Sequence, residues 1–161
     1  MAFWRRKCNP YWVHTDEVAR IVTNITKDSD VIASAHLHDV VEDTPVTIND
    51  IINKFGFRIG QIVSELTHVY TKESYPSWNR DKRKMAEVQR LSVISKEAKL
   101  IKIADIISNT ADIIPYDLEF AKVYLKEKVQ LLDVLKEGSP ELWIIADKQV
   151  RDGLNLASPL N

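Results

Sequence analysis

Hydrophobic residues recur every three or four positions along most of this chain, which is the spacing of one buried face on an α-helix. Ile59, Ile62 and Leu66 follow this spacing within residues 57–70. No stretch makes a convincing strand. The pattern predicts helices over residues 15–25, 29–44, 48–55, 57–70, 80–90, 97–113, 117–137 and 140–152.

Polar residues and prolines mark where several of these helices begin and end. Thr15-Asp16-Glu17 opens the first helix and places acids at the positive end of its dipole. Asp28 or Ser29 can cap the second helix, and Pro45 cannot continue it. Thr47 can cap the third helix in the same way.

The composition supports a helical fold. The chain has only 4 glycines and 6 prolines among 161 residues, whereas all-β domains need frequent turns. Its hydrophobic fraction of 45% and charged fraction of 28% are those of a globular protein, and its length suits one ordinary domain. We therefore expect one all-α domain, residues 1–161, built as a bundle of seven or eight helices.

Charge and cysteine content narrow the classes of function. The formal net charge of −1 argues against electrostatic binding of nucleic acid or of an anionic membrane over a broad surface. No apolar run reaches the length of about 18 residues needed to span a membrane, and no signal-peptide core is present. The single cysteine, Cys8, cannot form an internal disulfide, which favours a reducing, cytoplasmic location. Whether the chain forms a homo-oligomer stays open.

The stretch HLHDVVEDT, residues 36–44, combines two histidines with three acids. Imidazole nitrogen and carboxylate oxygen together suit manganese, iron or zinc. Acids at the C-terminal end of a helix oppose its dipole, and a nearby cation would resolve that conflict. In one continuous helix, His38 and Asp39 would lie about 100° apart and reach one ion only beside the helix edge. The alternative is a solvated acidic helix end with a buried histidine.

Two distant residues could complete a metal site. His14 lies near the start of the first helix, and Asp105 lies within the otherwise apolar stretch KLIKIADIISN. A carboxylate among apolar side chains is costly unless it is paired or bound to metal. A salt bridge with Lys102, three residues earlier, is the alternative explanation for Asp105.

Three motifs in the chain resemble those of the HD-domain metal-dependent phosphohydrolases. PYWVH…VARIV is similar to the family's PYIxHPxxVA, AHLHDVVEDT to ALLHDxVEDT, and KLIKIADIISN to KLxKLADRLxN. Over roughly residues 5–112 the chain most resembles the (p)ppGpp hydrolase domain of RelA/SpoT homologues, in its single-domain form, the small alarmone hydrolases.

The resemblance implies an all-α hydrolase whose substrate is a small phosphorylated nucleotide. It implies that Glu42 and Asp43 activate the water that attacks a 3′-pyrophosphate. Arg5 and Arg6 are expected to contact phosphate oxygens, and Asn109 to contact the nucleotide. The implied cofactor is one divalent metal ion, usually Mn²⁺, with the ligands His14, His38, Asp39 and Asp105.

The chain departs from the family pattern around the expected substrate. Thr15 replaces the proline after the first metal histidine, Cys8 replaces a glycine before PYI, and Ile106 replaces a basic residue. The substrate could therefore be another nucleotide, such as NADPH losing its 2′-phosphate or a nucleoside monophosphate. A nucleotide-sensing module without turnover is a further alternative, although a sensor would not need the acids Glu42 and Asp43.

Other polar and aromatic residues receive simpler interpretations. His36 is expected to pack or to support the site, and His68 to be a solvated residue near a helix end. The basic cluster in residues 80–84 is interpreted as a solvated helix face, with a phosphate-gathering rim or a nucleic-acid contact as alternatives. Tyr75 and Trp78 either stack on a purine or pack on the protein.

Overall fold

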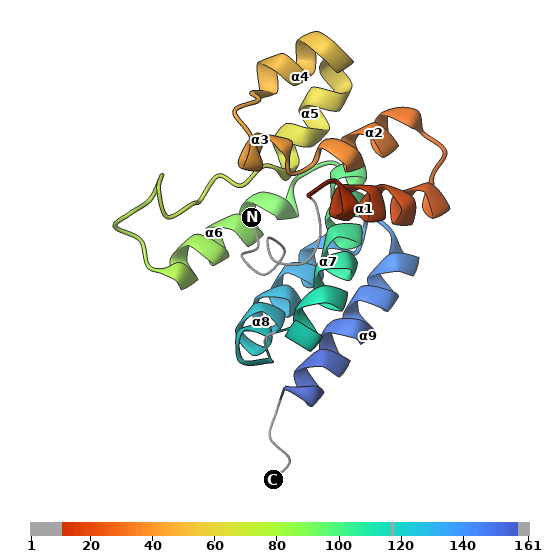
Figure 1. Cartoon of the computed structure of the whole chain (residues 1–161). Helices are drawn as coiled ribbons and strands as arrows, with labels where there is room; N and C mark the ends of the chain where they lie inside the picture. The colour runs from red at the N-terminus through yellow and green to blue at the C-terminus, as the bar shows by residue number, and fades with distance from the viewer. Residues whose placement is uncertain (1–10, 117, 158–161) are drawn as a thin grey trace.

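The computed structural model describes residues 11–116 and 118–157, and its regular structure is helical (Figure 1). No strand is present in these two ranges, so the predicted all-α fold is confirmed. Eight of the helices have eight residues or more, and α3 is a single turn. The helices are α1 (Tyr11–Ile25), α2 (Ser29–Leu37), α3 (Val40–Asp43), α4 (Ile48–Phe55), α5 (Phe57–Leu66), α6 (Arg80–Ser92), α7 (Lys96–Tyr116), α8 (Leu118–Leu135) and α9 (Pro140–Leu156).

α7 lies in the middle of the bundle (Figure 1). It packs against α1, α2, α5, α8 and α9. Because α7 is apolar on nearly all sides, residues such as Ile101, Ile103 and Ile106 are completely buried and form the centre of the main core. A polar side chain that faces inward from α7 therefore needs a partner.

The stretch HLHDVVEDT is not one continuous helix, and that expectation is wrong. α2 ends at Leu37 and α3 begins at Val40, with Asp39 at φ −102° and ψ −3° between them. This change of chain direction brings the side chains of His38 and Asp39 together, whereas a regular helix would place them about 100° apart.

Two of the predicted helix caps are confirmed. The Asp28 carboxylate accepts a hydrogen bond from the backbone N–H of Asp30 at 3.0 Å and caps α2. Thr47 and Asp50 form a reciprocal capping box at the start of α4. Both caps satisfy backbone N–H groups that have no partner within their helix.

Several predicted boundaries are wrong, including the end of the last helix, α9, which lies at Leu156 rather than at residue 152. α1 begins at Tyr11, and Thr15 lies inside it with its hydroxyl donating to the Trp12 carbonyl. α5 ends at Leu66, four residues earlier than expected. α7 continues through Pro115, because a proline in the last turn removes little of the helical hydrogen bonding.

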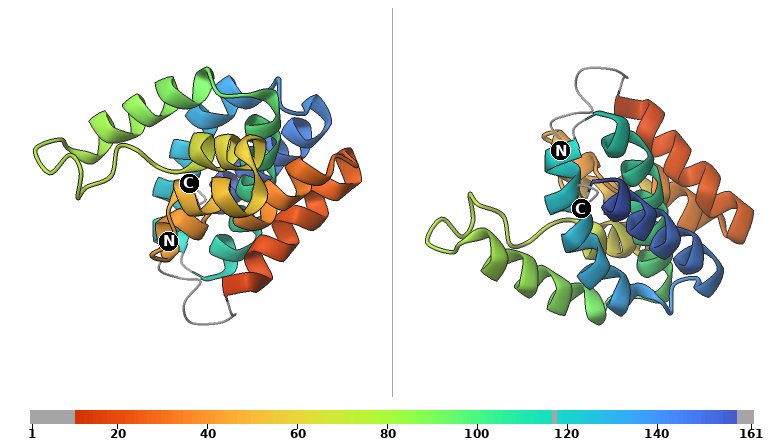
Figure 2. Two further views of the ribbon diagram at one scale, coloured as in Figure 1. Left: turned by 90° about the horizontal axis from the view of Figure 1, so that it is seen from above. Right: turned by 90° about the horizontal axis from the view of Figure 1, so that it is seen from below.

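α4 and α5 form a helical hairpin that projects at one end of the molecule (Figures 1 and 2). Gly56 separates the two helices with φ 95°, a backbone conformation that glycine adopts readily. Ile51, Ile59 and Val63 form a small second core beneath this hairpin.

The segment from residue 67 to 79 and the start of α6 extend away from the body of the molecule (Figures 1 and 2). Its aromatic rings contact one another: Trp78 stacks on Tyr70 with 5.8 Å between centroids and lies 4.8 Å from Tyr75. The loop aromatics therefore pack together within the loop.

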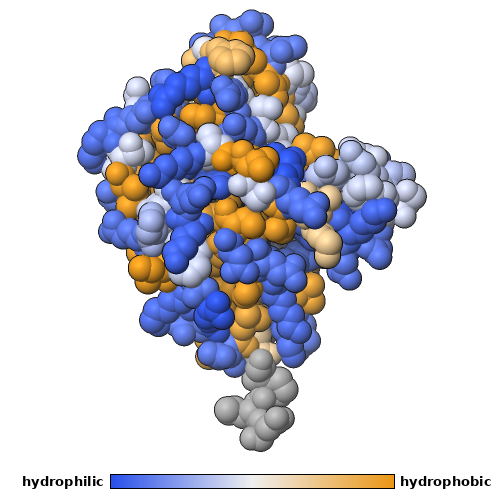
Figure 3. Space-filling model, turned by 180° about the vertical axis from the view of Figure 1, so that it is seen from behind, coloured by the Kyte–Doolittle hydropathy of each residue, from blue (hydrophilic) through white to orange (hydrophobic). Residues whose placement is uncertain are grey.

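Hydrophilic side chains cover most of the face seen from behind, with hydrophobic patches between them (Figure 3). Individual exposed apolar residues of this kind are normal on a folded protein. Among the helices of the described ranges, none combines the length and the apolar character needed to cross a bilayer.

Candidate metal centre and active site

The four residues singled out as metal ligands lie together, although they come from distant parts of the chain. His14 projects from α1, His38 and Asp39 from the break between α2 and α3, and Asp105 from α7. His14 Nε2 lies 3.1 Å from Asp105 Oδ1 and 3.8 Å from Asp39 Oδ2. His38 Nε2 lies 3.3 Å from Asp39 Oδ2 and 3.6 Å from Asp105 Oδ1. His14, His38 and Asp39 thus each place one ligand atom within 4.8 Å of the others, and Asp105 Oδ1 lies within ion-pair distance of both imidazoles.

Hydrogen bonds on the far side of each ring fix which nitrogen faces the other candidate ligands. His38 Nδ1 donates to the Ala35 carbonyl at 2.8 Å. The Ser108 hydroxyl donates to Glu17 at 2.7 Å, so its oxygen accepts from His14 Nδ1 at 3.0 Å. In a neutral imidazole the other nitrogen, Nε2, then carries a lone pair directed at the centre.

The centre strongly favours a positive charge. Burial alone would lower the pKa of His38, but the adjacent Asp39 and Asp105 outweigh it and raise the pKa to about 10. His38 Nε2 is buried and has no hydrogen-bond partner among the described residues. Lone pairs from two imidazoles and two carboxylates repel one another unless a cation lies between them, so the donor set fits a divalent metal ion.

Asp105 also has the salt bridge that was its alternative explanation. Lys102 Nζ lies 3.0 Å from Asp105 Oδ2, and both side chains are buried. Burial would raise the pKa of Asp105, but Lys102 and the two histidines hold it well below its usual range. One oxygen of Asp105 therefore faces Lys102 and the other faces the candidate metal centre.

Glu42 is oriented by His68. One Glu42 oxygen accepts hydrogen bonds at 2.9 Å from both the backbone N–H and the ring Nδ1 of His68. Burial would raise the pKa of Glu42, but these bonds lower it. Burial would lower the pKa of Lys102, but the charges of Asp105, Asp39 and Glu42 raise it.

The chain matches the family model described as HD domain over residues 4–140, which is most of its length. It belongs to the HD domain family. In this HD domain, His38 and Asp39 lie at the helix break described above.

Relatives of this HD domain include nucleotide pyrophosphohydrolases. The guanosine-3′,5′-bis(diphosphate) 3′-pyrophosphohydrolase MESH1 is 34% identical over 106 residues in Homo sapiens and 36% identical over 107 residues in Danio rerio. Each match covers 65% of this chain and 56% of the relative, so the similarity spans about half the length of these proteins. The GTP pyrophosphokinase rsh of Brucella ovis is 34% identical over 110 residues, which are 65% of this chain and 14% of rsh.

Two solved structures share the fold of this HD domain. A metazoan ortholog of SpoT, described as hydrolyzing ppGpp and acting in starvation responses, has a TM-score of 0.77 and 28% identity. That likeness covers 95% of this chain and 91% of the ortholog. The lmo0812 protein of Listeria monocytogenes EGD-e has a TM-score of 0.74, covering 92% of this chain and 98% of the other, and at 21% identity it supports the fold alone.

Some residues expected to contact the substrate lie outside the described residues, and others make different contacts in the structure. Arg5, Arg6 and Cys8 lie outside the described residues. Asn109 donates a hydrogen bond from its amide to Asp105 Oδ1, so its described contact is with the metal-ligand candidate. Ile106 is fully buried in the main core, where a charged side chain would lose its hydration.

Two histidines differ from their expected roles. His36 is exposed, so the packing or supporting role expected for it is wrong. His68 is a partner of Glu42 rather than a merely solvated residue. Its contact spans 26 positions in the chain, and no local pattern in the sequence could have indicated it.

The basic residues at the start of α6 mostly make contacts within the protein. Arg80 forms an ion pair with Glu127 of α8, and Arg83 donates to the Trp78 carbonyl. Lys82 lies over the Trp78 ring, 4.2 Å from its centroid. These contacts anchor the loop and α6 rather than leaving a wholly solvated face.

Proposed function

We propose that this HD domain is a metal-dependent phosphohydrolase that removes pyrophosphate from the 3′ position of guanosine 3′,5′-bis(diphosphate), ppGpp, or of its pentaphosphate. The observation that carries the proposal is the convergence of two imidazole nitrogens and two carboxylates, with Glu42 three residues beyond Asp39 in the chain. The activity printed in the names of MESH1 and of the metazoan SpoT ortholog supports the choice of reaction.

The proposed cofactor is one divalent ion, Mn²⁺, held by His14, His38, Asp39 and Asp105. When bound, such an ion supplies Lewis-acid charge for phosphate oxygens and lowers the pKa of water. The hydrogen bonds to Ala35 and Ser108 keep both imidazoles in the tautomer that can ligate it.

In the proposed reaction, water attacks the phosphorus bonded to the 3′ oxygen of the nucleotide. Glu42, oriented by His68, accepts the proton from that water, and Asp43 is the second acid of the pair. The bond between phosphorus and the 3′ oxygen breaks, that oxygen takes a proton, and pyrophosphate leaves. Arg5, Arg6 and Asn109 are proposed to bind the substrate.

The test is an assay of the Mn²⁺-loaded protein against 3′-pyrophosphorylated, 2′-phosphorylated and 5′-phosphorylated nucleotides, with products separated by chromatography. We expect GDP and pyrophosphate from ppGpp, with the 5′-diphosphate intact. Glu42→Gln keeps the shape but removes the base, so its rate should fall by about 10²–10⁴ with metal still bound. Cleavage of NADPH or a nucleoside monophosphate, but not of ppGpp, would refute the alarmone as substrate and leave the hydrolase class in place.

A further inference from the structure

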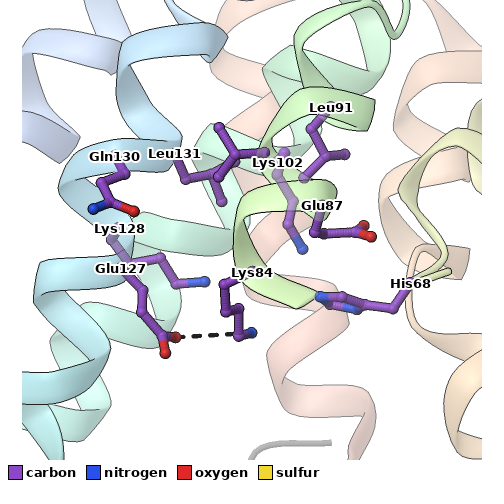
Figure 4. A pocket seen from close by; sticks show the side chains of 10 residues that line it. His68, Lys84, Glu87, Leu91, Lys102, Glu127, Lys128, Gln130 and Leu131 are labelled. Carbon is purple, nitrogen blue, oxygen red and sulfur yellow. Dashed lines mark ion pairs between the residues drawn. The ribbon is translucent and has the colours of Figure 1, made fainter. Parts of the chain in front are cut away.

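A pocket lies between α6 and α8 (Figure 4). Its wall includes Lys102, which hydrogen-bonds Asp105, and His68, which hydrogen-bonds Glu42. These two residues join the pocket to the candidate active site. A ligand in the pocket would therefore lie beside the reacting groups.

Three lysines from three different helices line this pocket. Lys84 comes from α6, Lys102 from α7 and Lys128 from α8, and their side chains reach into the space between α6 and α8 (Figure 4). Lys102 is already paired with Asp105, but Lys84 and Lys128 add two further ammonium groups, and the repulsion among the three in a partly buried site favours an anionic ligand.

The neighbouring acids are already engaged by other cations. Glu127 lies 3.7 Å from Lys84 Nζ, but it also accepts hydrogen bonds from Arg80. Glu87 accepts hydrogen bonds from Arg90 through Oε1, while its buried Oε2 has no hydrogen-bond partner among the described residues.

Lys128 is the least compensated of the three lysines. Its ammonium lies 4.6 Å from the centroid of the Tyr124 ring, and it forms no ion pair with a carboxylate of the described ranges. Burial and the repulsion of Lys102 and Lys84 lower the pKa of Lys128 to about 7. Burial likewise lowers the pKa of Lys84, against the opposing charge of Glu127. A multiply charged anion would relieve this repulsion and restore the charge of both groups.

Building on the proposed function, we propose that this pocket is a diphosphate subsite. In it, Lys84, Lys102 and Lys128 hold the outer phosphate of the 3′-diphosphate before cleavage and the released pyrophosphate after it. Phosphate oxygens are strong acceptors for ammonium donors, and several donors can share one phosphate.

The position of Lys102 explains why the subsite takes the 3′-diphosphate. Its Nζ lies 3.0 Å from Asp105 Oδ2, so an anion that contacts Lys102 from the pocket is adjacent to the metal-ligand candidates. The outer phosphate is one bridging oxygen away from the phosphorus under attack. The 5′-diphosphate is separated from that phosphorus by the whole ribose.

Calorimetric titration of the metal-free protein with sodium pyrophosphate tests the subsite without turnover. We expect binding that weakens by about tenfold to a hundredfold in Lys128→Gln and in Lys84→Gln, the loss expected for one charged hydrogen bond. Lys128→Arg keeps the charge and should retain most of the affinity. Lys126→Gln, which changes an exposed lysine on the same helix, should bind like the parent.

Each alternative result has a distinct meaning. No pyrophosphate binding by the parent protein, or equal affinity in Lys128→Gln, would overturn the subsite. If Lys128→Gln instead weakened binding of GDP and left pyrophosphate binding unchanged, the assignment to the 3′-diphosphate would be wrong. A protein that binds pyrophosphate through these lysines but does not hydrolyse ppGpp would keep the subsite and refute only the proposed reaction.

Discussion

At the scale of single residues, the candidate site depends on partners that orient the chemical groups. Ser108 and Ala35 fix the tautomers of His14 and His38, and His68 fixes the carboxylate of Glu42. The first two partners only position a ligand. His68 also changes the acidity of the group that it holds, because its hydrogen bonds and charge lower the pKa of Glu42.

This effect predicts a specific result for His68→Ala. As the proposed base, Glu42 would work only when deprotonated, so activity is expected to fall as the pH drops through its pKa. Removing the His68 ring raises that pKa, so the acidic limb of the pH–rate profile should move to higher pH. The loss of one hydrogen bond should also lower kcat by about tenfold, with metal affinity unchanged.

Steady-state kinetics across pH will measure this shift, and His68→Asn should restore part of the activity because its side chain retains an N–H donor. His36→Ala, which removes an exposed histidine, is the matched control. An acidic limb that stays in place in His68→Ala would contradict the orienting role.

At the scale of helices, ion pairs fix the start of α2 against α5, and His38 follows at the other end of α2. Asp28 caps α2 and accepts a hydrogen bond from Arg58 Nη2 of α5 at 2.7 Å, and Asp30 accepts one from Arg58 Nη1 at 3.0 Å. Asp28 is thus both a cap and a link between two helices. The sequence predicted the cap from its local pattern, but not the link to a residue 30 positions away.

The Asp28 link predicts how stability depends on pH. Hydrogen bonds from Arg58 lower the pKa of Asp28 from its usual 3.8 to about 2 in the folded protein. The stabilisation is therefore fully present above the pKa of Asp28 in the unfolded chain. It disappears as the pH falls toward the pKa of Asp28 in the folded protein. Asp28→Asn should lower the Tm by a few degrees at neutral pH.

Thermal unfolding of the parent and of Asp28→Asn between pH 2 and pH 7 will show whether their difference in Tm closes on acidification. Asp147→Asn provides the control, because Asp147 pairs with Arg151 on α9 without capping a helix. A difference that stays constant down to pH 2 would mean that Asp28 acts through something other than its charge.

At the scale of the whole molecule, the sequence predicted the all-α class and the residues that gather at the centre. A carboxylate inside an apolar helix and a dense His–Asp stretch are local signals for part of this set. The resemblance to HD-domain phosphohydrolases implied the full set, including His14. The helix break at Asp39 was not predictable, because nothing in HLHDVVEDT interrupts a helical pattern before Pro45. The sequence offered a phosphate-gathering rim at residues 80–84 only as an alternative, and it could not indicate the pocket, because Lys84, Lys102 and Lys128 become neighbours only when α6, α7 and α8 pack.

Because the four proposed metal ligands come from α1, the α2–α3 break and α7, metal binding should stabilise the entire fold. An ion that binds only the folded chain, and is present at about 100 times its Kd, adds about 2.7 kcal/mol to the free energy of unfolding. For a protein of this size, that corresponds to a Tm higher by about 5–10 °C.

We expect this shift when Mn²⁺ is added to the chelator-treated protein, measured by thermal unfolding. Asp105→Ala should unfold at a lower temperature and show no shift, while His36→Ala should shift like the parent. An equal shift in Asp105→Ala would place the ion elsewhere, since no other carboxylate of α7 lies within ion-pair distance of both His14 and His38 in the described structure.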